Sequence, residues 1–479
     1  MITSPAFAGK KYAVLGLARS GRAVVEALAA SGAEIMAWDQ SPQAREALSS
    51  SLPRSGGEGD RPKGGGGVEG AGDRGAAAEP QHPSQLPLHH PADGPPPHAA
   101  HGEELIRIAD PLATALYGYD GIVVSPGVPL NRHPIAERAR NAGVPLIGDI
   151  ELFAQARASL PPHKVIGITG TNGKSTTTAL VHHICRTAGL PATMAGNIGY
   201  PILGQEPLPE NGVYVLELSS YQIDLTHSLD CDVSVLLNVS PDHLDRYDGV
   251  EDYAASKARL FAMQSDAHVA VIAIDDDFTR AIAATVAGRK VLVSAADVKD
   301  QSHWPSLQGP HNAQNIAAAV AAARALGIAD TVIARGLASY RGLPHRMERI
   351  AEKHGVLFVN DSKATNPNSA APALAAYPRV HWILGGLPKS DDLDPCEPFL
   401  DHVRAAYTIG EAGPMFADLL EGKVPVRRCE MLHEAVSCAA SAAEPGEVVL
   451  LSPACASFDQ FRDYEARGDA FRAAVEALA

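Results

Sequence analysis

Short, continuously apolar runs recur along almost the whole chain and are separated by segments long enough to form helices. They include residues 12–17, 121–127, 164–170, 213–220, 232–240, 355–361, 380–386 and 447–454. These runs do not alternate with polar residues, so the strands that they form must be buried on both faces. Parallel sheets covered by helices bury their strands in this way, and the pattern therefore predicts an α/β protein.

Two short segments rich in Pro and Gly divide the chain. They are SLPPHK at 159–164 and RGLPHR at 341–346, and linkers between domains have this kind of composition. The length of 479 residues suggests about three domains at roughly 150 residues each. We therefore expect three domains, at 1–158, 159–342 and 343–479.

Residues 51–103 depart from this pattern, because they are rich in Gly, Pro and His and contain few residues that fill a core. Such a segment cannot bury enough apolar surface to offset the entropy lost on ordering. We expect a disordered surface insert within the first domain. Metal binding by its histidines is the alternative, but they lack the spacing of a ligand set.

Composition excludes several classes of protein. The net charge of -15 argues against broad binding of nucleic acid or of anionic membranes. No run approaches the roughly 20 apolar residues of a membrane span, and the first residues lack a signal-peptide pattern. The six cysteines show neither CxxC pairs nor zinc spacing, which favours a reduced, cytoplasmic compartment. We expect a monomer.

The stretch GITGTNGKST at 167–176 lies between an apolar run and a helix-like segment. Gly170 and Gly173 would let backbone N–H groups approach an anion, and Lys174 adds a positive charge. Ser175 or Thr176 can reach Mg²⁺, and the start of the helix adds its dipole. The strict Walker pattern has a glycine where this chain has an isoleucine. The loop alone does not distinguish a kinase, an NTPase and a ligase.

Further polar residues stand out against their surroundings. Glu217 ends an apolar run, where a carboxylate is costly to bury without a cation or hydrogen-bond donors. His243 follows the next strand, and Lys257 lies inside the helix expected at 251–263, where a solvated lysine is the default interpretation. Asn312 and Asn315 share a helix face and could pair with a base edge, with helix capping as the competing explanation.

A second polar turn, NDSKATN at 360–366, follows a late strand. Turn chemistry explains its Asn, Asp and Ser residues, but it does not explain Lys363 or the nearby Arg346. Near the start, GLARSG at 16–21 resembles a dinucleotide fingerprint with Ala18 in place of a glycine, and Asp39 follows at a suitable distance. A nicotinamide-dependent oxidoreductase and a nucleotide-diphosphate site are both open here.

The order of the motifs is more informative than any one of them. They are GTNGKST, GNIG (196–199), LELSSYQ (216–222), NVSPDHLDRY (238–247), HNAQN (311–315), GLPHR (342–346), NDSKATN and SPACASFDQF (452–461). In this order they resemble the Mur ligase family, and the last two resemble its D-glutamate-adding branch. The resemblance covers essentially the whole chain outside the insert. Folylpolyglutamate synthases share the phosphate loop but should lack NDSKATN, and the DNPR-type motif of the diaminopimelate-adding ligases is absent.

The resemblance implies a Rossmann-like N-terminal domain that binds the UDP end of the substrate. It also implies a central ATPase domain of the P-loop type with a parallel sheet, and a Rossmann-like C-terminal domain that binds the amino acid. The implied reaction joins D-glutamate to UDP-N-acetylmuramoyl-L-alanine through an acyl phosphate, in cytoplasmic peptidoglycan precursor synthesis. ATP and two Mg²⁺ ions are the implied cofactors.

Site residues carry over position by position. The resemblance implies catalytic roles for Lys174, Asn197, His243 and Lys257. It implies metal contacts at Ser175, Glu217, His243 and Lys257, the last as a carbamate formed with CO₂. It implies ATP contacts at Gly170, Thr171, Asn172, Gly173, Lys174, Ser175, Thr176, Asn312, Asn315, Arg346, Asp361 and Lys363. It implies D-glutamate contacts at Lys363, Thr365, Lys389, Ser457, Phe458 and Tyr464, and UDP contacts at Leu17, Ala18, Asp39 and Gly127.

Overall fold

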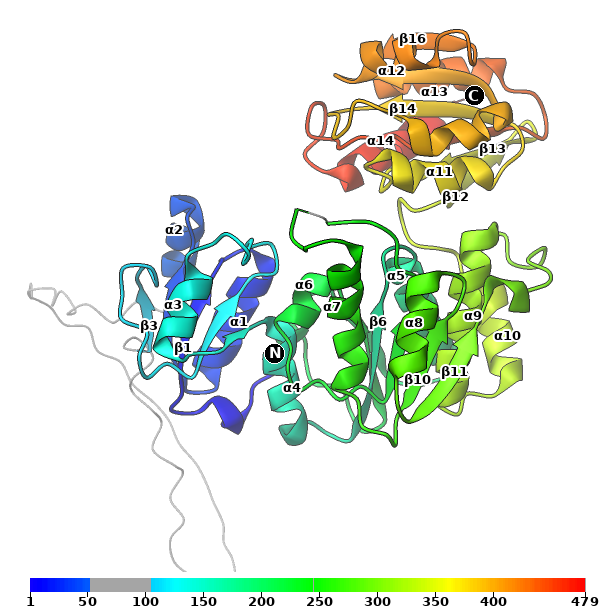
Figure 1. Ribbon diagram of the computed structural model, residues 1–479. Coiled ribbons are helices and arrows are strands. Elements are labelled where there is room, and N and C mark those ends of the chain that lie inside the picture. The colour runs from blue at the N-terminus through cyan, green and yellow to red at the C-terminus, as the bar shows by residue number, and fades with distance from the viewer. Residues whose placement is uncertain (52–104, 244, 479) are drawn as a thin grey trace, which may run out of the picture.

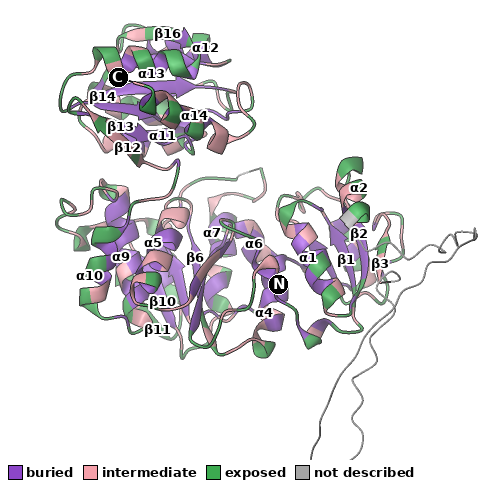
Figure 2. Ribbon diagram, turned by 180° about the vertical axis from the view of Figure 1, so that it is seen from behind, coloured by how far each residue is buried: buried purple, intermediate pink, exposed green. Residues whose placement is uncertain are grey.

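The computed structural model describes residues 1–51, 105–243 and 245–478, which form three sheets in succession along the chain (Figure 1). The insert expected at 51–103 lies almost entirely outside the described residues. Strands alternate with helices throughout, and the strands are buried between more exposed helices (Figure 2). The α/β class expected from the apolar runs is confirmed, and each of those runs overlaps a strand.

The first sheet contains five parallel strands in the order β3-β2-β1-β4-β5. Its elements are β1 (Lys11–Leu15), α1 (Arg19–Ala30), β2 (Glu34–Trp38), α2 (Pro42–Ser51), β3 (Ile106–Ile108), β4 (Gly121–Val124), α3 (Ile135–Ala142) and β5 (Leu146–Ile147). Helix α4 (Asp149–Ala156) leads to the second sheet. One apolar core joins the two units, since Phe153 of α4 and Tyr214 of the second sheet belong to the same cluster as Val14 of β1.

The second sheet contains six parallel strands in the order β11-β10-β9-β6-β8-β7. Its strands are β6 (His163–Thr169), β7 (Ala192–Gly196), β8 (Gly212–Glu217), β9 (Val233–Leu236), β10 (Val269–Ala273) and β11 (Arg289–Val293). Its helices are α5 (Lys174–Thr187), α6 (Ser220–Asp224), α7 (Val250–Ala262), α8 (Asp277–Thr285), α9 (Pro310–Ala325) and α10 (Asp330–Ser339). Val235 packs in the core of α5 and α9, while its neighbour Leu236 packs in that of α7 and α8. Alternate side chains of β9 therefore fill two layers, as the unbroken apolar run requires.

The third sheet has the order β12-β13-β17-β14-β15-β16, with one antiparallel pair at β12 and β13. Its strands are β12 (Glu348–Lys353), β13 (Val356–Asn360), β14 (Val380–Gly385), β15 (Val403–Ile409), β16 (Val426–Glu430) and β17 (Val448–Leu451). Its helices are α11 (Pro367–Ala375), α12 (Gly413–Leu420), α13 (Leu432–Ala442) and α14 (Tyr464–Glu476). Its two apolar clusters contain no residue of the first two sheets. This unit is thus a separate body that faces the central one across the connection near residue 343 (Figure 1).

Candidate active site

The glycine-rich loop follows β6, a strand in the middle of the central sheet, and leads directly into α5. Gly170 and Gly173 adopt φ values of +152° and +81°, in the region that side chains other than glycine rarely adopt. A Cβ atom at Gly173 would lie 2.2 Å from Oδ1 of Asn315, so the loop has room for backbone only. Lys174 folds back over the loop and donates to the carbonyls of Gly170 and Thr171, at 2.9 and 2.8 Å. This arrangement is typical of a phosphate cradle.

A network of amides lies beside the loop. Asn315 accepts from the hydroxyl of Thr177 at 3.2 Å and donates to Oδ1 of Asn312 at 3.0 Å. Asn312 in turn donates to the carbonyl of Gln308 at 2.9 Å. Gly309 occupies the N-cap position of α9 and makes no side-chain cap bond, so the capping explanation for Asn312 is wrong.

Two residues that the sequence analysis did not single out extend this network. Asn238 exchanges hydrogen bonds with the backbone of Asn172, at 2.8 and 3.2 Å, and also donates to Gln314 at 2.8 Å. Gln314 donates onward to Asp275 at 2.7 Å. The sequence could have pointed to both residues, because Asn238 lies inside the quoted motif NVSPDHLDRY and Gln314 lies inside HNAQN.

A cavity of about 120 Å³ opens between this network and the C-terminal unit. It is lined from the central unit by Asn172, Gly173, Asn312 and Asn315, and from the other side by Arg346 and Asp361 together with part of α11. The phosphate loop and NDSKATN therefore meet at one cavity, although they are far apart in the sequence.

Glu217 and Asn197 lie at the neighbouring strand ends. Glu217 is only 1 % exposed, and its Oε1 accepts from the amide of Asn197 at 2.8 Å. Its Oε2 is buried and has no hydrogen-bond partner among the described residues. A buried carboxylate oxygen without a donor is costly, and a cation beside it would remove that cost.

Lys257 is a buried lysine rather than the solvated one that is the default inside a helix. It is 1 % exposed, donates to the carbonyl of Gly170 at 3.0 Å, and its Nζ lies 4.3 Å from the ring centre of Tyr253. Burial, with a further contribution from Lys174, lowers the pKa of its amine well below the usual value. Burial likewise lowers the pKa of Lys174, although Glu217 opposes the shift. Both shifts make the charged form of these amines less favourable than it is for a lysine in water.

His243 lies in the loop after β9 with φ +56°. Its ring packs against Tyr221 and Tyr253, with ring centres 4.8 and 5.9 Å apart. Burial lowers the pKa of His243; Asp242 opposes this shift, while Lys174 and Lys257 add to it. The loop, Lys257 and the phosphate cradle therefore form one electrostatic unit.

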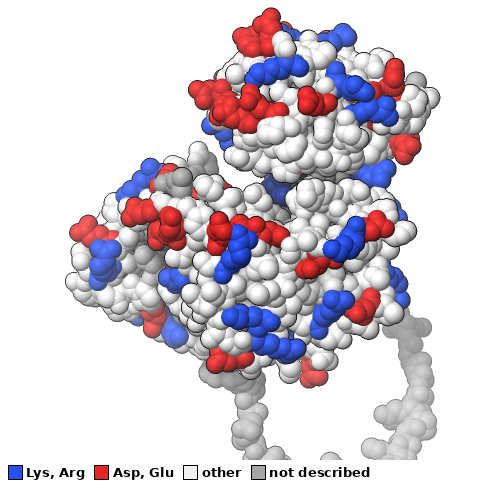
Figure 3. All heavy atoms as spheres, turned by 45° about the vertical axis from the view of Figure 1, so that its right-hand side comes forward, with Lys and Arg blue, Asp and Glu red and all other residues white. Residues whose placement is uncertain are grey.

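The C-terminal unit contributes charged groups from its side of the cavity. Arg346 lies 3.4 Å from Oγ of Ser175, across the connection between the two units. Asp361 is buried and accepts from the hydroxyl of Ser452 at 2.9 Å and from the N–H of Met347 at 3.1 Å. Burial raises the pKa of Asp361 to about 7. Lys and Arg side chains are visible in the recess between the two units (Figure 3).

Most of the residues expected to contact D-glutamate gather at the strand ends of the third sheet. Nζ of Lys363 lies 3.9 Å from the ring centre of Tyr464, and Lys389 donates to Thr365 at 3.2 Å. Ser457 is buried, whereas Phe458 is 68 % exposed. Phe458 thus packs against little of the described chain and is available to a ligand.

Arg467 holds these loops together, and the sequence analysis did not identify it. Its guanidinium is 1 % exposed and donates to the hydroxyl and carbonyl of Ser362 at 3.0 and 2.9 Å. It also donates to the carbonyls of Cys455, Ala456 and Gly385, at 3.0, 3.1 and 3.4 Å. Three loops therefore depend on one side chain from α14. A lone arginine in a helix gives no sequence signal for such a role.

The GLARSG turn lies apart from the cavity. The N–H of Leu17 donates to Asp39 at 2.6 Å. Leu17 and Ala18 line a second cavity of about 320 Å³, together with Arg19, Arg22 and Tyr200 among others. The two arginines were not predicted, yet they place positive charge at the start of α1, where an anion is favoured. Gly127 has nothing within 4 Å of where a Cβ would lie.

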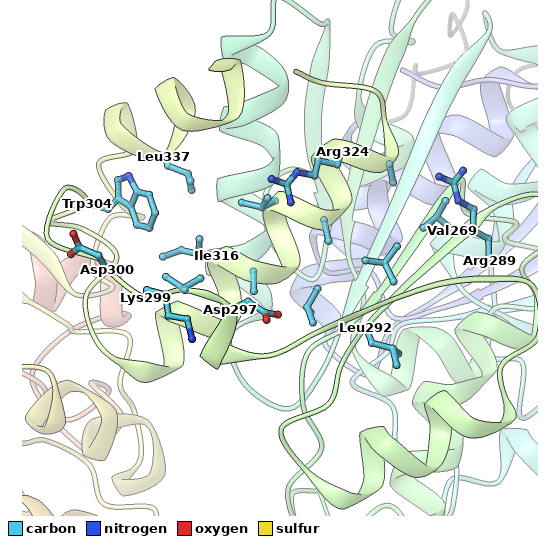
Figure 4. Close-up of a pocket in the computed structure, with 17 residues that line it drawn as sticks. Val269, Arg289, Leu292, Asp297, Lys299, Asp300, Trp304, Ile316, Arg324 and Leu337 are labelled. Atoms are coloured by element: carbon cyan, nitrogen blue, oxygen red, sulfur yellow. The ribbon is translucent and has the colours of Figure 1, made fainter. Parts of the chain in front are cut away.

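A larger cavity of about 620 Å³ lies at the edge of the central sheet, between β11 and α9 (Figure 4). Its lining is mainly apolar and includes Leu292, Trp304, Ile316 and Val320. None of the expected site residues lines it. Size alone therefore does not identify the reactive site, which we place at the phosphate loop.

A phosphate loop, an amide-lined cavity and charged groups from a second unit define a class of protein, the P-loop enzymes whose nucleotide site lies between domains. Comparison with known proteins is more specific. Residues 168–306 match the family described as Mur ligase middle domain, and residues 345–455 match Mur ligase, glutamate ligase domain.

Full-length relatives agree with these matches. A protein of Novosphingobium aromaticivorans named UDP-N-acetylmuramoylalanine–D-glutamate ligase is 61% identical over 100% of this chain and 97% of its own length. A protein of the same name from Sphingopyxis alaskensis is 56% identical over 100% of both. A solved structure of the MurF ligase of Thermotoga maritima in complex with ADP shares the fold, with a TM-score of 0.55 and 18% identity over 72% of this chain and 92% of that one. The chain belongs to the Mur ligase family.

Proposed function

We propose that this chain joins D-glutamate to UDP-N-acetylmuramoyl-L-alanine at the expense of ATP, as a step of peptidoglycan precursor synthesis. The observation that carries this proposal is the 61% identity, over the whole chain, to a protein named for that reaction. The location of the expected residues around the phosphate loop supports it independently. No helix among the described residues has the length and apolar character needed to cross a membrane.

We assign the triphosphate of ATP to the loop 170–176, with Lys174 beside the transferred phosphoryl group. A glycine is required at 173, because a Cβ there would lie 2.2 Å from Oδ1 of Asn315. The base would occupy the cavity lined by Asn312 and Asn315, and Arg346 and Asp361 would reach it from the C-terminal unit. In phosphoryl transfer, most of the stabilisation of the transition state comes from hydrogen bonds and positive charges directed at the oxygens on which negative charge develops.

The residues present suit Mg²⁺, which prefers oxygen ligands and retains several waters. Ser175 and Glu217 would hold one ion, and the orphaned Oε2 of Glu217 is the feature that fits it best. His243 and a modified Lys257 would hold the second. Bound there, the ions would offset the repulsion between a carboxylate and a triphosphate.

We further propose that Lys257 is a carbamate in the active protein. The modification joins the neutral amine to CO₂ with loss of one proton, so the lowered pKa of this buried amine favours it. The product is an anion, which Lys174 attracts, whereas a protonated Lys257 would be repelled by Lys174. Lys257→Ala should be inactive, and short-chain carboxylates should restore part of the activity. A fully active variant, or one that carboxylates do not rescue, would contradict the modification.

The muramoyl substrate, whose carboxylate accepts the phosphoryl group, and the amino acid would enter from opposite sides of the central unit. We assign the uridine diphosphate to residues 1–158, at Leu17, Ala18, Asp39 and Gly127, and ATP to residues 159–342. D-Glutamate would bind residues 343–479, with Lys389 pairing with a carboxylate and Phe458 covering the ligand. Asn197 would lie near the acyl group.

In the first step an oxygen of the alanyl carboxylate attacks the γ-phosphorus, the bond from that phosphorus to the bridging oxygen breaks, and ADP leaves as the acyl phosphate forms. In the second, the amine of D-glutamate attacks the acyl carbon, loses a proton, and phosphate leaves as the amide forms. The chain's contribution is to hold three anionic reactants in contact, which requires the cluster of positive groups described above.

The test is phosphate release with ATP, Mg²⁺ and UDP-N-acetylmuramoyl-L-alanine while the amino acid is varied. D-Glutamate should support turnover, and L-glutamate and L-lysine should not. Turnover with L-lysine would refute the substrate, while phosphate release that needs no muramoyl substrate would refute the reaction. A Lys174→Met variant should abolish release in every arm.

A further inference from the structure

A group of metal-ligating side chains lies at the far edge of the third sheet, where β16 turns into α13. The ligand atoms of Cys429, Glu434 and Cys438 all lie within 4.8 Å of one another. None of these residues contributes to the ligase reaction proposed above. Both cysteines carry free thiols.

The local fold explains how these atoms meet. Glu434 and Cys438 are four residues apart on α13, so their side chains project from the same face. Cys429 is the next-to-last residue of β16, and Glu430, the last, has φ +57°, which reverses the chain toward the helix. Cys429 is buried, Cys438 is partly buried and Glu434 is exposed. The cluster therefore has a closed protein side and an open side that faces solvent.

We propose that Cys429, Glu434 and Cys438 bind a thiophilic divalent cation, with Zn²⁺ as the favoured metal and water as the fourth ligand. Two thiolates and a carboxylate form a ligand set that Zn²⁺ accepts in tetrahedral geometry, with Zn–S bonds of about 2.3 Å. Two sulfur atoms bonded to one such ion lie about 3.8 Å apart, so a small side-chain adjustment from the present spacing suffices. Mg²⁺ is disfavoured, because it prefers oxygen ligands.

Proton balance makes the proposal specific. Burial, with Cys438 beside it, raises the pKa of the Cys429 thiol to about 12, although Arg427 opposes the shift. A cysteine binds Zn²⁺ as the thiolate, so a metal bound to both sulfur atoms displaces the two thiol protons. Affinity should fall as the pH is lowered.

The site also has a connection to the substrate loops. The amide of Gln460 donates to the carbonyl of Glu430 at 2.8 Å and contacts the sulfur of Met431 at 3.6 Å. Gln460 belongs to the same loop as Ser457 and Phe458. A metal at this corner would thus restrain the turn on which the D-glutamate loop rests.

The experiment uses the full chain, freed of metal and of any purification tag, and reduced with a phosphine that does not chelate. Titration with Co²⁺ should produce thiolate-to-metal charge-transfer absorption and the visible bands of a tetrahedral ion, saturating at one ion per chain. Zn²⁺ should abolish both signals. Histidines elsewhere in the chain can bind Co²⁺ but give no charge-transfer band, so the signal reports the cysteines.

Variants then locate the site. Cys438→Ser and Cys429→Ser should lose the charge-transfer band, Glu434→Gln should keep it with weaker affinity, and Cys396→Ser, at a buried thiol elsewhere, should behave as the parent. Circular dichroism and ligase turnover of Cys438→Ser show whether the fold survives. Absence of the band in the reduced parent would overturn the proposal, as would its persistence in Cys438→Ser. If the parent gives no charge-transfer band and its intact mass falls by two hydrogens after air oxidation, Cys429 and Cys438 form a disulfide instead of a metal site.

Discussion

The buried carboxyl of Asp361 makes a prediction about stability that can be worked out from the structure. Asp361→Asn keeps the shape of the side chain. Its oxygen can still accept from the N–H of Met347, and its amide can donate to the hydroxyl of Ser452. The substitution therefore removes the titration of this group and retains its packing.

The magnitude follows from the raised pKa. The carboxyl has a pKa of about 7 in the folded chain against an ordinary value of 3.8, so between these pH values the folded state binds more protons than the unfolded state. Stability conferred by this proton is fully present below pH 3.8 and is lost as the pH rises through 7. Each pH unit in the window is worth about 1.4 kcal/mol. Between pH 5 and pH 8 the parent should lose about 3 kcal/mol that Asp361→Asn does not lose.

The assay is urea unfolding followed by the fluorescence of Trp382, whose indole donates to the carbonyl of Ser452 at 2.7 Å. Trp38→Phe and Trp304→Phe form the background, so that only the C-terminal unit reports. Asp391→Asn, at an exposed carboxyl of the same unit, is the control and should show no such effect.

The decisive quantity is the difference in unfolding free energy between Asp361→Asn and its parent. It should grow in favour of the variant as the pH rises from 5 to 8. A difference that is the same at both pH values would refute the raised pKa. The same variant should bind ATP more weakly, because we assign this carboxylate to the nucleotide, and a stability gain with a loss of function is common at such sites.

Three other substitutions test the site. Gly173→Ala should abolish ATP binding in calorimetry, whereas Gly189→Ala, with a similar φ of +79° and nothing within 4 Å of a Cβ, should cost only about 1 kcal/mol of stability. Glu217→Gln keeps the bond to an amide and removes the charge, so phosphate release should require much more Mg²⁺; an unchanged Mg²⁺ dependence would contradict its metal role. Arg467→Met leaves several buried acceptors without a donor, which should cost about 3 kcal/mol in urea unfolding and raise KM for D-glutamate more than KM for ATP.

The α/β class was predictable because many of the strands are largely apolar on both faces. The run at 232–240 shows why, since Val235 and Leu236 enter opposite layers and neither could be polar. The positions of the loops relative to one another were not predictable from periodicity. The contact between Ser175 and Arg346 depends on the relative orientation of two separately packed units. No local sequence pattern encodes that orientation.

The candidate site was predictable where polar residues interrupt an apolar context. Glu217 could be identified because burying a charge is costly, and the structure finds it buried. Lys257 was singled out only by the family resemblance, since a lysine inside a helix is solvated by default, and the structure finds it buried as well. Arg467 could not be identified, because its partners are backbone carbonyls, which any sequence provides. Asn238 and Gln314 lay inside quoted motifs, but their partners come from other elements, and only the folded arrangement reveals the pairing.

The burial of positive groups predicts that the third unit closes on the second when ligands bind. Burial lowers the pKa of both Lys174 and Lys257, Lys174 lowers that of Lys257 further, and Arg346 adds to the lowering at Lys174. Holding these groups together is unfavourable until anions arrive between them. Because Arg346 belongs to the unit that shares no core with the ATP-binding sheet, the balance that favours closure must come mainly from the ligands. The phosphates of ATP and the carboxylate of the acceptor supply that charge, so substrate binding and domain closure should be a single coupled event.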